Sequence, residues 1–179
     1  MTHHRRIVIF IAVCSIVYIS GCIGEKRHEL KKIMSVPINI PQCFLQKDNG
    51  GDENVGVIIN SYKTLFFIDS IHCVTCNLKQ IAFLHQAIQE DYHIPLWVIV
   101  ASRKKDFLEV QHYVKSLDPS IMVFVDTCNV FWKGNPQIPQ EQSMHIFLLD
   151  SCNNVLVVGD PTRGKVKELY KKVLQNDWK

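Results

Sequence analysis

Charge of either sign is nearly balanced in this chain, and glycine, proline and cysteine are all sparse. The 179 residues include 20 Lys and Arg against 17 Asp and Glu, a formal charge of +3, which is too small to indicate a nucleic-acid partner. Eight glycines and seven prolines leave no room for long low-complexity linkers. Seven cysteines are well below the content of a disulfide scaffold. Of the whole chain 47% is hydrophobic, which together with its length predicts one packed globular domain.

The N-terminal segment has the pattern of an export signal. Residues 1–6 end in two arginines, and a nearly unbroken apolar run of 13 residues follows at 7–19. That run is too short to cross a hydrocarbon core of about 30 Å comfortably. A basic start, a short apolar stretch and then small residues are typical of a secretory signal.

The end of this segment resembles the bacterial lipobox, because residues 19–22 read Ile-Ser-Gly-Cys. The resemblance implies cleavage after residues 1–21, acylation of Cys22, and attachment to a membrane in the cell envelope, facing the periplasm or the cell exterior. The alternatives are a plain signal or a short anchor helix with an incidental cysteine. We expect residues 22–54 to form a tether and N-terminal extension, in which the charged residues 25–35 form a tether or a short helix and residues 36–46 add an edge strand.

Hydrophobic periodicity predicts alternating strands and helices from residue 55 onward, so the expected domain is 55–179. Expected strands are 55–60, 64–68, 95–101, 121–125, 144–149 and 155–158, and expected helices are 75–90, 104–117 and 165–175. The early strands are apolar throughout, as parallel strands covered on both faces must be. The last two are joined by a tight turn and are therefore antiparallel. The sequence predicts a mixed α/β sheet of four to five strands with helices on both faces.

The chemistry-bearing motif is Cys73-Val-Thr-Cys76, placed directly after the strand 64–68 and at the start of the helix 75–90. Two residues between cysteines at a helix start allow the sulfurs to reach disulfide distance. The first sulfur faces the positive end of the helix dipole, which stabilises its thiolate. Cys73 is therefore the candidate nucleophile, and Cys76 is the candidate resolving thiol.

Motif and element order together resemble the thioredoxin-like superfamily, and most closely its membrane-tethered, redoxin-type thiol–disulfide oxidoreductases. The resemblance covers about residues 55–175 and implies a thioredoxin-like fold with Cys73 and Cys76 as the catalytic pair. It implies no organic cofactor. The expected partners are protein dithiol or disulfide substrates and a second redox protein, and the direction of electron flow is left open.

Four positions depart from the thioredoxin pattern. His72 stands in place of the tryptophan before the first cysteine, and Thr75 stands in place of the proline before the second. Phe67 occupies the position of the buried acid, and Met144 occupies the approximate position of the cis-proline. We expect His72 and Met144 to contact the substrate, on a surface that differs from that of ordinary thioredoxins.

Two alternatives use the same residues differently. If Met144 faces the dithiol, then His72, Cys73, Cys76 and His145 could converge with it on Cu(I) or Zn(II), which sulfur and imidazole ligands suit. Two cysteines and one histidine are an incomplete zinc site, so no metal ligand is assigned. The other alternative is a non-catalytic lipoprotein whose thioredoxin-like domain only binds a partner.

Several other residues carry weaker hypotheses. Cys128 and Cys152 are either inert thiols or a structural pair, and Cys43 is unassigned. The Phe-Trp pair at 131–132 either packs over the end of the sheet, which we favour, or forms part of a substrate rim. Asp69 either caps the turn before Cys73, which we favour, or relays protons to Cys76.

Overall fold

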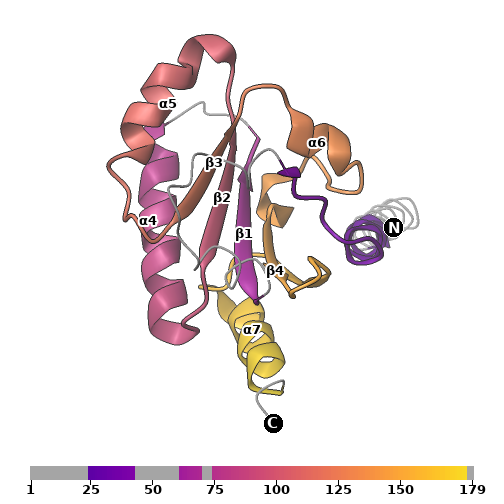
Figure 1. Cartoon of the computed structure of the whole chain (residues 1–179). Coiled ribbons are helices and arrows are strands. Elements are labelled where there is room, and N and C mark those ends of the chain that lie inside the picture. The colour runs from indigo at the N-terminus through magenta and orange to yellow at the C-terminus, as the bar shows by residue number, and fades with distance from the viewer. Residues whose placement is uncertain (1–23, 43–60, 70–73, 177–179) are drawn as a thin grey trace, which may run out of the picture.

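The fold is built on one mixed five-stranded sheet, seen in a computed structural model that describes residues 24–42, 61–69 and 74–176 (Figure 1). The strand order is β3-β2-β1-β4-β5. The strands β1 (Lys63–Ile68), β2 (Leu96–Ala101) and β3 (Met122–Asp126) are parallel, whereas β4 (Ile146–Leu149) is antiparallel to β1 and β5 (Val155–Val158) is antiparallel to β4.

Both faces of this sheet are covered, which explains why every residue of β1 and β2 is buried. Helices α4 (Val74–Asp91), α5 (Phe107–Val114) and α7 (Gly164–Asn176) pack on one face. The other face is covered by α6 (Val130–Gly134) and by a helix at residues 24–34. The expected mixed sheet with helices on both faces is confirmed.

The apolar side chains of the sheet divide between the two faces by strand alternation. On the face of α4, the buried side chains include Phe66, Ile68, Val98 and Val100. On the opposite face they include Leu65, Phe67, Trp97, Ile99, Phe147 and Leu149. Each face therefore has its own hydrophobic core, and β1 contributes to both.

The N-terminal segment is part of the second core. Ile33, Ile38 and Ile40 are buried among the side chains of that face. The backbone N–H of Ile38 donates to Asn153 O at 2.9 Å in the turn between β4 and β5. Side-chain atoms of Asn135 bond both backbone groups of Asn39, accepting from its N–H at 2.7 Å and donating to its carbonyl at 2.9 Å. The core therefore begins upstream of residue 55, within the expected tether.

Several element boundaries differ from those expected. Residues 37–41 form no strand; the N–H groups of Ile38 and Asn39 bond to the β4–β5 turn and to the Asn135 side chain instead of to a neighbouring strand. The connection 126–143 contains α6 and most of a 3₁₀ turn, η2 (Gln142–Met144), so the following strand starts at Ile146 rather than at Met144. The expected strand 55–60 lies outside the described residues. Within the described part of the chain, no helix is both long and apolar enough to cross a bilayer.

Candidate functional site

The cysteine motif lies where β1 leads into α4. β1 ends at Ile68, α4 begins at Val74, and Cys76 is the third residue of this 18-residue helix. The first turn of a helix leaves backbone N–H groups without partners and carries the positive end of the dipole. His72 and Cys73 lie outside the described residues, as does the side chain of Cys76. Their roles and the distance between the sulfurs therefore stay predictions.

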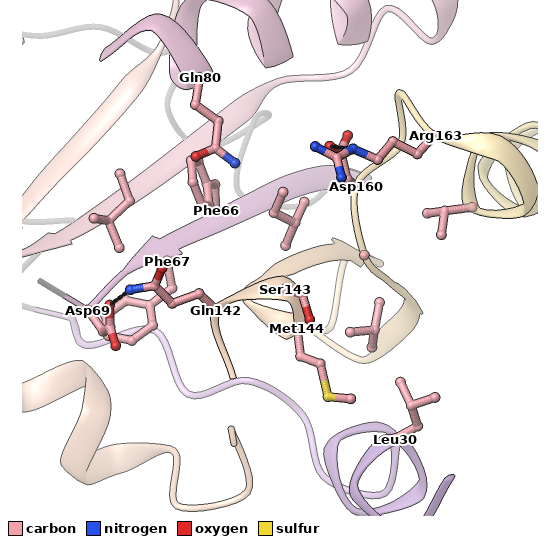
Figure 2. A pocket seen from close by; sticks show the side chains of 15 residues that line it. Leu30, Phe66, Phe67, Asp69, Gln80, Gln142, Ser143, Met144, Asp160 and Arg163 are labelled. Carbon is pink, nitrogen blue, oxygen red and sulfur yellow. Dashed lines mark hydrogen bonds and ion pairs between the residues drawn. The ribbon is translucent and has the colours of Figure 1, made fainter. Parts of the chain in front are cut away.

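A cavity of about 510 Å³ opens at this same end of the sheet (Figure 2). It is bounded by the last residues of β1, by α4 through Gln80, by η2, and by the segment that follows β5. The helix 24–34 closes one side through Leu30. Its apolar wall is formed by Leu30, Phe66, Phe67, Ile68, Met144, Ile146, Val158 and Val166.

Two pairs of polar side chains lie on the rim of the cavity. Gln142 donates from Nε2 to Asp69 Oδ1 at 2.9 Å, which ties η2 to the end of β1. Arg163 and Asp160 form an ion pair at 3.0 Å on the opposite rim, as Figure 2 shows. Asp69 thus binds a side chain of the neighbouring loop. Neither its expected capping role nor its proton-relay role is tested, since the turn it precedes lies outside the described residues.

Met144 lies in the wall of the cavity and is 7% exposed. Its backbone N–H donates to Glu141 O at 2.9 Å, within the 3₁₀ turn η2. In Figure 2 its side chain points toward the helix that carries Leu30. No cis peptide bond occurs in the described part of the chain. The Met144 thioether therefore lies in the cavity wall, and the backbone N–H of Met144 is hydrogen-bonded within the turn.

Phe67, at the position of the buried acid, is the centre of an aromatic cluster. Its ring centroid lies 4.9 Å from that of Phe131, 5.4 Å from that of Trp132 and 5.2 Å from that of His145. Phe131 is fully buried, which confirms that this aromatic pair packs over the sheet. Position 67 therefore holds an aromatic ring of this core in place of a carboxylate.

His145 belongs to this cluster and is not among the residues that line the cavity. It is 1% exposed, its Nε2 lies 2.7 Å from Pro139 O, and its Nδ1 has no hydrogen-bond partner. Met144 and His145 are thus placed in different surroundings. Within the described ranges, no group of three or more His, Cys, Asp or Glu side chains is arranged to hold a metal ion.

The hypothesis of a structural pair between Cys128 and Cys152 is wrong. Both are free and exposed. Cys128 follows β3, at the end of the sheet where the parallel strands finish. Cys152 lies in the turn after the antiparallel strand β4, at the end of the sheet where the parallel strands begin. The length of the sheet therefore separates the two thiols. Cys43 lies outside the described residues.

Comparison with known proteins yields similar solved structures only. No protein-family model and no curated protein matches the chain. Yeast Sco1 matches with 14% identity and a TM-score of 0.48 over 66% of this chain and 83% of its own. Copper-bound ScoI of Arabidopsis thaliana matches with 16% identity and a TM-score of 0.46 over 67% of this chain and 85% of its own.

A thioredoxin-like protein from Aeropyrum pernix matches with 14% identity and a TM-score of 0.44, over 86% of this chain and 98% of its own. At such values, likeness carries no inference about activity or ligand. The strand order, the strand directions and the helix-covered faces show an α/β fold of the thioredoxin-like class.

Proposed function

We propose that this protein is a thiol–disulfide oxidoreductase that acts through Cys73 and Cys76. The observation that supports the proposal is that Cys76 is the third residue of α4, the helix that follows β1, and that the last residues of β1 line a cavity with an apolar wall. A helix start lowers the pKa of a cysteine there and so favours the reactive thiolate. The cavity offers space for the side chains that flank a substrate disulfide.

The proposed reaction is a two-step exchange of one electron pair. The Cys73 thiolate attacks one sulfur of the substrate disulfide, forming a mixed disulfide and releasing the first substrate thiolate. The Cys76 thiolate then attacks the Cys73 sulfur, releasing the second substrate thiolate and leaving the Cys73–Cys76 disulfide. The substrate is reduced by two electrons, and a separate dithiol protein reduces the enzyme again. With an oxidised enzyme and a reduced substrate the same steps run in reverse.

The experiment that tests this proposal traps the intermediate. Cys76→Ser should accumulate mixed disulfides with substrate proteins through Cys73, and Cys73→Ser should abolish them. Cys128→Ser is the matched control, because Cys128 is a free, exposed thiol that follows the C-terminal end of a strand parallel to β1. In the reduced protein, Cys73 should also alkylate faster than Cys76 at pH 6–7. Trapping that needs Cys76 rather than Cys73 would reverse the assigned roles, and no trapping with either variant would refute the proposal.

A second candidate is a Cu(I)- or Zn(II)-binding module, which the Met144 thioether in the cavity wall favours. Soft sulfur ligands suit Cu(I). Met144→Leu keeps the side-chain volume and removes the sulfur, so it should weaken Cu(I) binding if Met144 is a ligand. Stoichiometric metal uptake by the reduced protein without turnover would favour this candidate. Neither uptake nor turnover would indicate a non-catalytic domain.

We further propose that the chain is held in the cell envelope by acylation of Cys22, on the evidence of residues 19–22. Cys22→Ser should then remove fatty-acid labelling and release the chain from membranes. Unchanged labelling in this variant would exclude the lipobox interpretation without bearing on the redox proposal.

A further inference from the structure

The helix at residues 24–34 has two chemically different faces. One face packs on the protein, where Leu30 lines the cavity and Ile33 is fully buried. The other face is exposed and carries Arg27, His28 and Lys31. Arg27 and Lys31 are four residues apart, so their side chains project from the same side of the helix.

The exposed face carries positive charge that the protein itself does not neutralise. Lys26 is paired with Glu141 at 2.9 Å, and Lys32 donates to Pro136 O at 3.2 Å. Within the described residues no ion pair is recorded for Arg27 or Lys31. The helix holds four Lys and Arg against two Glu, so its net charge is positive.

Exposed apolar side chains continue this face at the C-terminal end of the helix. Met34 is 48% exposed and Val36 is 50% exposed. Basic side chains beside exposed apolar ones suit the boundary of an anionic bilayer, since the charges attract the lipid head groups and the apolar groups enter the interface. A partner rich in phosphate alone, such as a nucleic acid, gives no role to Met34 and Val36.

We propose that the outer face of helix 24–34 docks on an anionic phospholipid surface. The proposal is independent of the redox activity. It agrees with the place of the chain's proposed acylation site, because Cys22 precedes the first described residue of this helix by two positions. An acyl chain at that point would hold the basic face close to the head groups.

Docking in this way would set the position of the cavity relative to the bilayer. Leu30 lies on the inner face of the same helix and forms part of the cavity wall. A helix with its side chains is about 10–12 Å in diameter, so the cavity would lie about one helix diameter from the lipid surface. Substrates would then be met at the membrane surface rather than in the surrounding solution.

A photo-crosslinking experiment on the full chain tests the proposal. A benzoylphenylalanine probe replaces Met34 in the protein as processed by a bacterial host, and the purified protein is mixed with vesicles of phosphatidylglycerol and phosphatidylethanolamine or of phosphatidylcholine. The control probe replaces Leu108, which is 78% exposed on α5 and lies on the other face of the sheet. We expect lipid crosslinks from position 34 in the anionic vesicles and none above background from position 108.

Charge reversal separates electrostatic docking from simple tethering. Arg27→Glu combined with Lys31→Glu should lower lipid crosslinking from position 34 at least about tenfold, as should high salt. Lys104→Glu combined with Lys105→Glu makes the same change in charge at exposed residues beside α5 and should leave crosslinking unchanged. Equal crosslinking from positions 34 and 108, no loss on reversal, or crosslinks in native membranes to a protein instead of lipid would overturn the proposal.

Discussion

Replacing Ile33 by alanine tests whether the N-terminal helix belongs to the folded domain. Ile33 has no exposed surface and packs in the core formed by the face of the sheet that carries Phe67 and Trp97. Alanine is the best helix former, so the substitution does not disfavour the helix itself. Any loss of stability therefore measures the packing of this side chain against the sheet.

The expected loss follows from the buried carbon that is removed. Ile33→Ala deletes three carbons, worth about 0.8 kcal/mol each when fully buried, or about 2.4 kcal/mol in all. The cavity left behind adds to this value, and measured costs for such substitutions are about 2–5 kcal/mol. We expect about 3 kcal/mol, which for a domain of this size lowers Tm by about 6–12 °C.

The assay is equilibrium urea unfolding together with thermal unfolding, followed by circular dichroism. Met34→Ala is the matched control, because Met34 is the next residue of the same helix and is 48% exposed. It should change the free energy of unfolding by less than about 0.5 kcal/mol. If Ile33→Ala costs no more than Met34→Ala, the segment is a solvated tether and the assignment of its isoleucines to the core is wrong.

Substitutions at three further positions test other parts of the structure. Burial lowers the pKa of Lys63 from its usual 10.5. Between the folded-state and unfolded-state pKa values the unfolded chain binds more protons, so the free energy of unfolding rises with pH there. In urea titrations from pH 7 to 10.5, Lys63→Met should remove that rise, and an unchanged pH dependence would show that the pKa of Lys63 is not lowered. Asp126 is 2% exposed and accepts three backbone N–H bonds from residues at and before the start of α6. Asp126→Ala should therefore cost about 2–4 kcal/mol on urea unfolding, and a cost below about 1 kcal/mol would show that these three bonds contribute little to stability. Met144→Pro removes the backbone N–H that bonds to Glu141 O and should lower the free energy of unfolding by about 1–3 kcal/mol. Met144→Leu keeps that N–H and should lower it by less than about 1.5 kcal/mol. Equal stability of the two variants would show that this bond does not stabilise the η2 turn.

Local pattern was sufficient for the elements that position the cysteine motif. β2 is a continuous apolar run, β1 is apolar from Leu65 to Ile68, and Ile81, Leu84 and Ile88 recur at helical spacing, so these patterns predict a strand, a helix and a second strand. The motif spans the start of the second of these elements, and its position there followed from the order of the strand and the helix. These predictions succeed because burial on both faces leaves a strand little freedom in composition.

The N-terminal helix and the cavity were decided only by tertiary structure. Residues 25–32 are mostly charged, so the sequence predicts a tether or a short helix and gives no packing partner for it, and Ile33 becomes a core residue only through its packing with the sheet and α6. The cavity likewise combines Leu30, Gln80 and Met144, which are far apart in the chain and meet only after the sheet has formed. Sequence periodicity reports which face of one element is apolar, whereas the partner of that face depends on long-range packing that no local pattern encodes.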